Sequence, residues 1–207
     1  MSWLLPALMV LAPALWFANG IRKIGKISSG DPIGPRPGTA LLMIDLQTVF
    51  WASGIFGESV KTKAKATILS EAEAAKTNRI PIIAVRQEWS IPSTQAIARL
   101  LMKGQAVAGT PGTEIASPFS DLADHVLVKR VQDAFETGEL DKLLVGLDVG
   151  KLRIVGLDTN YCVAKTALAA RQRGFEVEIV TRGVLSADTT AAEKTLNMLR
   201  TRLVTLD

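Results

Sequence analysis

Residues 152–173 read LRIVGLDTNYCVAKTALAARQR and contain three kinds of local structure. The mostly apolar run from Leu152 to Leu157 predicts a buried strand of a parallel sheet. A short turn, residues 158–161, follows this strand. The chain's only cysteine, Cys162, then stands where a helix rich in Ala, Leu and Arg begins. The stretch therefore predicts a strand, a turn and a helix, with a thiol at the start of the helix.

Two interpretations of Cys162 follow from this position. The first turn of a helix presents unpaired backbone N–H groups and a partial positive charge of roughly half an electron. A thiol placed there loses its proton more easily and becomes a better nucleophile. The alternative is that Cys162 is a small buried hydrophobic residue, as many free cysteines are. The stretch alone leaves both interpretations open.

The composition is that of one globular domain. The chain has 207 residues, of which 48% are hydrophobic and 21% charged, so it is long enough for one substantial core and is not disordered. A single cysteine cannot form an intrachain disulfide, so nothing requires an oxidising compartment. The net charge of +4 comes largely from residues 22–36, which precede the expected globular part. With no nucleic-acid-binding motif, the sequence does not predict nucleic acid as a partner.

The N-terminal segment is apolar and is followed by basic residues. Residues 3–18 carry no charge, with Trp3 and Trp16 near the two ends, and about 20 such residues span a bilayer. The basic cluster follows the apolar run, whereas a cleavable signal peptide usually carries positive charge before it. We therefore expect residues 1–27 to form a hydrophobic helix that associates with a membrane and leaves the following domain on the cytoplasmic side. The alternative is a helix buried against a neighbouring subunit.

A linker and an α/β domain follow. Residues 28–38, SSGDPIGPRPG, are rich in Pro and Gly and predict the linker, so the domain is expected over residues 39–207. Strands are predicted at residues 39–46, 80–85, 126–129, 152–157, 177–181 and 203–206, and helices at 58–78, 94–103, 136–147 and 188–200. This alternation predicts a mostly parallel sheet covered by helices on both faces.

Three reactive side chains stand at the carboxyl ends of predicted strands. They are Asp45, Lys129 and Cys162. In open parallel sheets, ligands bind beyond the carboxyl ends of the strands, so these groups are expected on one rim. A carboxylate can take the thiol proton there, while an ammonium group favours both anions, which suits covalent catalysis. The alternative is a structural ion pair between Asp45 and Lys129 beside an inert cysteine.

These residues also lie in motifs that resemble a known family. The segments ALLMIDLQTVFW, VLVKRVQDAFETGELDKLL and GLDTNYCVAKTALAARQRGFEVEIV are similar to the three motifs of the isochorismatase-like cysteine hydrolases, which include nicotinamidase and N-carbamoylsarcosine amidohydrolase. The resemblance covers residues 39–207. It implies a three-layer Rossmann-like fold with a six-stranded sheet and a homo-oligomeric assembly. It also implies a catalytic triad of Asp45, Lys129 and Cys162, with Cys162 as nucleophile.

The resemblance implies a mechanism as well. It places a non-proline cis peptide at Leu157–Asp158, which would aim the backbone N–H of Asp158, together with that of Cys162, at a developing oxyanion. Asp45 would deprotonate Cys162, the thiolate would attack a carbonyl carbon, and a thioester would be hydrolysed by water. True isochorismatases lack the cysteine, so the expected reaction is hydrolysis of a small amide or related C–N bond.

Other departures from the family concern metal and substrate. Nicotinamidases carry an aspartate and histidines that bind a metal beside the second strand, but residues 86–95 here read RQEWSIPSTQ, and the only histidine is His125. We therefore expect neither a metal nor another cofactor. Substrate contacts are expected from four residues near the first two strands: Gln47, Phe50, Trp51 and Trp89. Trp89 could equally pack at a subunit interface. The alternative function is a membrane-tethered, non-catalytic binding or scaffold module on the same fold.

Overall fold

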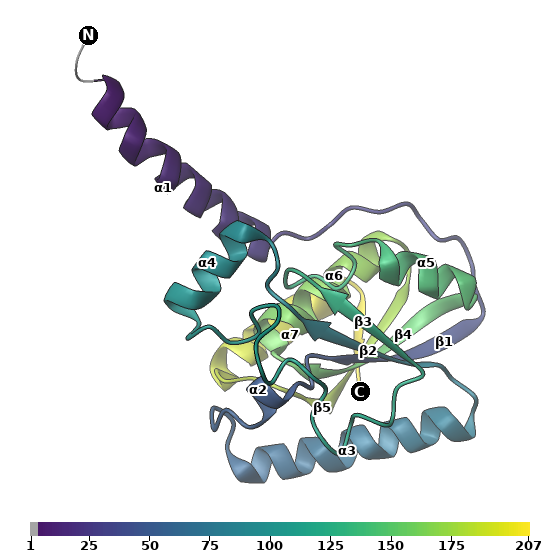
Figure 1. Cartoon of the computed structure of the whole chain (residues 1–207). Helices are drawn as coiled ribbons and strands as arrows, with labels where there is room; N and C mark the ends of the chain where they lie inside the picture. Colours follow the sequence, from purple (N-terminus) through teal and green to yellow (C-terminus); the bar gives the residue numbers. More distant parts are fainter. Residues whose placement is uncertain (1–3) are drawn as a thin grey trace.

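A computed structural model describes residues 4–207 of the chain, with side chains from Leu11 onward. Its strands are β1 (Gly38–Ile44), β2 (Ile82–Gln87), β3 (His125–Lys129), β4 (Val149–Leu157), β5 (Glu176–Leu185) and β6 (Val204–Leu206). Its α-helices are α1 (Leu4–Ile24), α2 (Thr48–Trp51), α3 (Glu58–Thr77), α4 (Pro92–Leu101), α5 (Glu139–Gly146), α6 (Ala164–Gln172) and α7 (Thr189–Thr201). A single π turn, η1 (Thr159–Val163), joins β4 to α6. Figure 1 shows the arrangement.

The described strands form one six-stranded sheet in the order β3-β2-β1-β4-β5-β6, and every neighbouring pair is parallel. β1 lies in the middle, with Leu42 opposite Ile83 of β2 and Ile154 of β4. Because all strands run the same way, their carboxyl ends share one edge. The predicted three-layer fold with a six-stranded sheet is confirmed.

Helices cover both faces of the sheet, as the apolar strands require. In β1, Leu42 and Ile44 pack into the core beneath α5, α6 and α7, whereas Leu41 and Met43 pack against α3 on the other face. A strand buried on both sides has no polar face, which explains why the buried residues 40–44 of β1 are an unbroken apolar run. Figure 1 shows α3 below the sheet and α5 and α6 above it.

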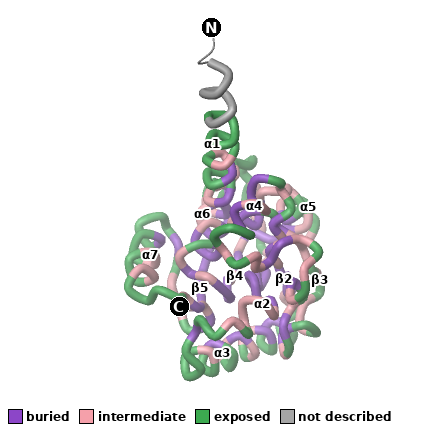
Figure 2. Tube along the Cα trace, turned by 60° about the vertical axis from the view of Figure 1, so that its left-hand side comes forward, coloured by how far each residue is buried: buried purple, intermediate pink, exposed green. Residues whose placement is uncertain are grey.

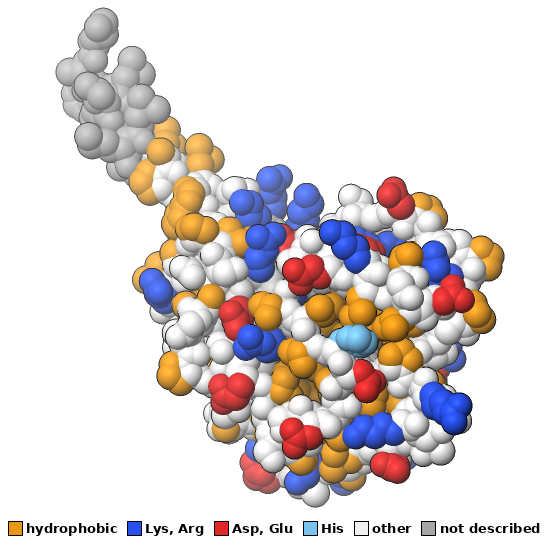
Figure 3. Space-filling view, turned by 45° about the vertical axis from the view of Figure 1, so that its right-hand side comes forward, with side chains coloured by type: hydrophobic (Ala, Val, Ile, Leu, Met, Phe, Trp, Pro, Cys, Tyr) orange, Lys and Arg blue, Asp and Glu red, His pale blue; other side chains and the backbone are white. Residues whose placement is uncertain are grey.

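α1 projects from this sandwich. Its C-terminal part lies against α4, while residues 11–16 stand clear of the domain and are exposed (Figures 1 and 2). Leu11, Leu15 and Trp16 are exposed, and basic side chains gather where the helix meets the domain (Figure 3). Within the described residues, no helix is long and apolar enough to cross a membrane. The expected membrane segment, residues 3–18, begins outside the described residues, at Trp3.

The Pro- and Gly-rich linker is a fixed strap rather than a free tether. The backbone N–H and hydroxyl of Ser28 donate to Asp133 at 2.7 and 2.6 Å. Arg173, which is fully buried, donates to the backbone oxygens of Ser28 and Ser29 and to the carboxylate of Asp141. Ile33 donates its backbone N–H to the carbonyl of Arg173 at 2.9 Å. The strap therefore connects α1 to the body of the domain through buried polar contacts.

Several element boundaries differ from those predicted. β4 begins at Val149, before the predicted start, because its first residues pair with the N-terminal end of β1. β5 continues to Leu185, well beyond the predicted end, because Val184 and Leu185 pair with the last residues of β4. The hydrophobic pattern of a single segment does not reveal such pairings, because they depend on the neighbouring strand.

Candidate active site

Asp45 is the first residue after β1, at the carboxyl edge of the sheet. Its backbone N–H donates to the carbonyl of Val85 at 2.8 Å, and its φ is +54°, in the left-handed region that Asp and Asn tolerate better than most residues. The side chain is 2% exposed. Its Oδ2 lies 3.0 Å from Nζ of Lys129, whereas the buried Oδ1 makes no hydrogen bond to any described residue. One oxygen is thus held by a cation and the other remains available.

Lys129, the last residue of β3, connects the other members of the site. Its side chain is completely buried. Nζ lies 3.0 Å from Oδ2 of Asp45 and 3.2 Å from Sγ of Cys162, and it donates to Oε1 of Gln87 at 2.6 Å. The carbonyl of Val131 is a further acceptor at 3.3 Å. A buried ammonium group with this many partners is held in one position.

Cys162 lies in the π turn, just before α6. Its side chain is 9% exposed, and the peptide bond between Leu157 and Asp158, at the start of the turn, is cis, as the resemblance implies. Asp158 precedes the turn, and its Oδ1 accepts the backbone N–H of Asn160 at 2.8 Å. The thiol therefore faces Lys129 from the strand-to-helix connection, and the three residues Asp45, Lys129 and Cys162 meet as predicted.

The electrostatics of the site differ from those expected of a helix N-terminus. Burial, and then the negative charge of Asp45, raise the pKa of Cys162, although Lys129 opposes both effects. Burial also raises the pKa of Asp45 above its ordinary value, against the lowering effect of Lys129. For Lys129, burial alone would lower the pKa, but the charges of Asp45 and Cys162 raise it overall. At rest the thiol is protonated, so a reaction at Cys162 needs a base.

Gln87 is a member of the site that the sequence reasoning missed. It ends β2, its Oε1 accepts from Lys129, and its Nε2 donates to the carbonyl of Lys129 at 3.3 Å. The signal was available, because Gln87 is a polar residue at the end of a buried strand, just as Asp45 and Lys129 are. Gln47, expected to contact substrate, instead fixes this region: its Nε2 donates to the carbonyls of Gln87 and Thr113, and its Oε1 accepts the N–H of Gln87.

A cavity of about 410 Å³ opens above the thiol. Asp45, Gln87 and Cys162 lie among the residues that line it, and so does Asp158, whose carboxylate accepts from Ser186 and Ala187. Most of the remaining lining is apolar: Phe50, Ile55, Phe56, Trp89, Met102, Leu157, Tyr161 and Ala187, with Ser53, Gln105 and Gln132 as polar additions. In the described part of the chain, no Lys, Arg or His side chain lines this cavity.

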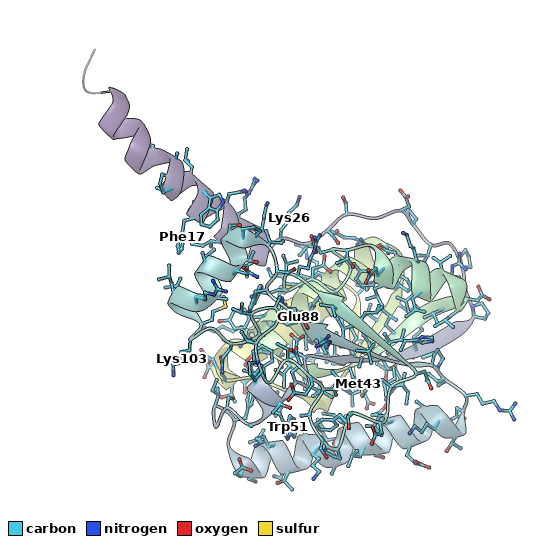
Figure 4. The ribbon with its side chains drawn as sticks, in the orientation of Figure 1. Phe17, Lys26, Met43, Trp51, Glu88 and Lys103 are labelled. Carbon is cyan, nitrogen blue, oxygen red and sulfur yellow. The ribbon has the colours of Figure 1, made fainter. Side chains whose placement is uncertain are left out.

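Of the four residues expected to contact the substrate, two line the cavity and two do not. Phe50 and Trp89 line the cavity, and Trp89 is 5% exposed. Gln47 and Trp51 do not line it. Trp51 points toward α3, where its ring lies edge-on to Phe119 at 4.8 Å and beneath Nζ of Lys61 (Figure 4). The reason is geometric: α2 is a helix, so adjacent residues such as Phe50 and Trp51 point in different directions.

Comparison with known proteins identifies the family. The model of the isochorismatase domain matches residues 39–206. The chain belongs to the isochorismatase family. The match includes Asp45, Lys129 and Cys162 and begins after α1 and the strap. A comparison with functionally curated proteins gave no significant match.

Solved structures of this family have the same fold. The pyrazinamidase of Pyrococcus horikoshii, in complex with zinc, is 25% identical, with a TM-score of 0.69 over 83% of this chain and 99% of the other. The nicotinamidase of Bacillus subtilis is 22% identical, with a TM-score of 0.68 over 82% and 99%. An isochorismatase family protein of Desulfovibrio vulgaris is 24% identical, with a TM-score of 0.67 over 83% and 94%. Family and site geometry together fit a hydrolase.

The residues of this family member do not fit a metal site such as the zinc complex indicates for the Pyrococcus protein. Among the described residues, no three His, Cys, Asp or Glu side chains gather closely enough to hold an ion. The carboxylate next to β2, Glu88, is paired with Arg86 at 2.8 Å. His125 lies at the start of β3, the end opposite Lys129. No metal-dependent step is therefore derived for this chain.

Proposed function

We propose that this isochorismatase-family protein is a cysteine hydrolase that cleaves the C–N bond of small uncharged amides. The observation that carries the proposal is the buried contact of Lys129, at 3.0 and 3.2 Å, with Asp45 and Cys162, two residues that line the cavity. A carboxylate that can accept a proton, a thiol and a fixed cation are the parts that acyl transfer through a thioester requires.

The first half of the reaction forms the thioester. Asp45 takes the proton of Cys162, and Sγ bonds to the carbonyl carbon of the amide. The negative charge then passes to the carbonyl oxygen, where the backbone N–H groups of Asp158 and Cys162 would stabilise it. As the tetrahedral intermediate collapses, Asp45 returns its proton to the nitrogen, the C–N bond breaks and ammonia or an amine leaves.

The second half regenerates the thiol. Asp45 accepts a proton from a water molecule, whose oxygen bonds to the thioester carbon. The C–S bond breaks, Sγ recovers a proton from Asp45, and a carboxylic acid leaves. Lys129 keeps its charge throughout, because the neighbouring anions raise its pKa. The net reaction consumes one water and one amide.

The lining of the cavity favours a substrate with an uncharged, largely apolar acyl group. A substrate carboxylate or phosphate buried here would have no cationic side chain of the cavity wall opposite it, and an unpaired buried charge is costly. Phe50 and Trp89 instead offer flat apolar surfaces. Primary amides with an aromatic or short aliphatic acyl group match this lining, and the solved relatives named as nicotinamidase and pyrazinamidase make nicotinamide and pyrazinamide sensible members of a test panel.

The test is ammonia release from a panel of primary amides by the wild-type chain and by Cys162→Ala. We expect turnover of at least one uncharged amide by the wild type, no turnover by the variant, and equal thermal unfolding of the two. The chain has no other cysteine, so mass spectrometry of a quenched reaction reports a thioester at Cys162 without ambiguity. Full activity of Cys162→Ala would refute covalent catalysis. A wild-type chain inactive on the whole panel, with a thiol unreactive toward iodoacetamide, would favour a non-catalytic binding module instead.

A further inference from the structure

α1 lies before the family domain, yet it packs next to the cavity. The family match begins at residue 39, whereas α1 ends at Ile24. Ile24 is 6% exposed and belongs to a small apolar cluster with Trp89 and Ile97, against which Phe17 and Met102 also pack. Two members of this cluster, Trp89 and Met102, line the cavity above Cys162. This cluster therefore extends from α1 to the wall of the space where the substrate is proposed to bind.

The contact between α1 and α4 is close. A Cβ atom added at Gly20 would lie 2.7 Å from Cδ1 of Ile97 and 2.8 Å from Cβ of Ser93, so only glycine fits there without displacing α4. Figure 1 shows α4 lying along the base of α1, and Figure 4 shows Phe17 at this junction. Close packing at Gly20 thus fixes the distance between α1 and α4.

A second connection reaches the cavity from the same end of α1. The backbone N–H of Gln132 donates to the carbonyl of Ile24 at 3.1 Å, and Gln132 lines the cavity. On the other side of the cluster, Trp89 donates its backbone N–H to Ala106 at 2.8 Å, which joins it to the loop after α4. The cavity wall is therefore bound to α1 at two places, through Gln132 and through the cluster around Trp89.

We propose that α1 is a positioning element of the substrate site, and that Ile24 holds the wall formed by Trp89 and Met102 in the shape that binds an apolar acyl group. A wall that is already in place when the ligand arrives saves the ordering cost of forming it, so loss of the support weakens binding rather than chemistry. The proposal rests on the proposed function only in taking this cavity as the substrate site. It concerns access to Cys162, which can be measured without turnover.

The experiment compares two alkylating probes of Cys162 on the full chain. Iodoacetamide is small, whereas N-benzyliodoacetamide carries an aromatic group that needs the apolar wall. For Ile24→Ala we expect the half-saturating concentration of the benzyl probe to rise on the order of threefold or more, with its maximal rate and the rate of iodoacetamide unchanged. Ile24→Val, which restores most of the side chain, should recover wild-type behaviour. Ile21→Ala is the matched control, because Ile21 is on the same helix and 52% exposed.

A second variant perturbs the same junction by a different route. Gly20→Ala keeps Ile24 but pushes α1 and α4 apart, so it should also weaken saturation by the benzyl probe, whereas Gly146→Ala, at a helical glycine with open space around it, should not. Thermal unfolding tests whether each variant is folded. The proposal is overturned if both junction variants fold and bind the benzyl probe as the controls do, or if both probes slow to the same extent. Because alkylation forms a C–S bond at Cys162 and releases iodide without any hydrolysis, an inactive enzyme leaves this result valid.

Discussion

Replacing Asp45 with asparagine should slow hydrolysis but speed up the alkylation of Cys162. Asp45→Asn keeps the shape of the side chain and suits the left-handed φ of +54°, which alanine would tolerate less well. It removes the base that takes the proton of Cys162. Loss of a general base typically reduces rates by about 10²–10⁴, so we expect hydrolysis to fall within that range.

Alkylation of the same thiol should become faster. The charge of Asp45 raises the pKa of Cys162, while Lys129, at 3.2 Å from Sγ, lowers it. Oδ2 of Asp45 and Sγ lie 3.0 and 3.2 Å from the same Nζ, so they are at most about 6 Å apart, and two like unit charges at that separation repel by about 3 kcal/mol at an effective dielectric constant of about 20. One pKa unit corresponds to about 1.4 kcal/mol, so removing the carboxylate charge should lower the pKa of the thiol by at least about one unit.

The assay is the rate of iodoacetamide labelling at pH 8, followed by mass spectrometry. This pH lies below the raised pKa of Cys162, so each unit by which the pKa falls gives about ten times more thiolate, and we expect labelling to accelerate about tenfold or more. Asp148→Asn is the matched control, since Asp148 has the same φ of +54° and makes an exposed ion pair with Arg36. Slower labelling in Asp45→Asn, or hydrolysis close to the wild-type rate, would refute the assigned roles.

Three further predictions concern charge and the strap. Lys129→Met should lower the free energy of unfolding by about 3–5 kcal/mol, measured in urea, because it leaves the carboxylate of Asp45 buried without its cation. In the wild type, kcat/KM should rise with pH through an apparent pKa above the ordinary aspartate value of 3.8, because Asp45 must be ionised to act as base and burial raises its pKa. A rise in kcat/KM with an apparent pKa at or below 3.8 would contradict this prediction. Ser28→Ala should cost about 1–3 kcal/mol of unfolding free energy by removing a 2.6 Å hydrogen bond to Asp133, whereas the exposed Ser29→Ala should cost little.

The fold and the meeting of Asp45, Lys129 and Cys162 followed from local sequence because each depends on a local signal. An apolar run such as β1 predicts a strand buried on both faces, and parallel strands place their carboxyl ends together. Asp45 and Lys129 stand out because each is a charged residue at the end of such a run, and a buried charge is costly unless it is paired. Gln87 obeys the same rule but was overlooked, because a neutral amide is less conspicuous than a charge, although its Oε1 lies only 2.6 Å from Lys129.

Other features depended on packing that no local pattern contains. Trp51 was expected at the substrate site because it follows β1, but the direction in which a side chain leaves a short helix is set by the turn of that helix. For the strap, the richness in Pro and Gly predicts only a linker. Its contacts come from Asp133 and Arg173, residues distant in sequence. The acidity expected of Cys162 at a helix start was outweighed by burial and by Asp45.

The burial of the triad is itself an argument against a purely structural ion pair. Removing a carboxylate and an ammonium group from water costs several kcal/mol for each ion, and well-packed apolar residues of similar size often stabilise a core as well or better. Asp45 and Lys129 are 2% and 0% exposed, so this cost applies in full, yet Oδ1 of Asp45 lacks a hydrogen bond to any described residue. An ion pair selected for stability would satisfy both oxygens. A general base, in contrast, needs one oxygen free to receive the proton of Cys162 and then to pass it to the leaving nitrogen.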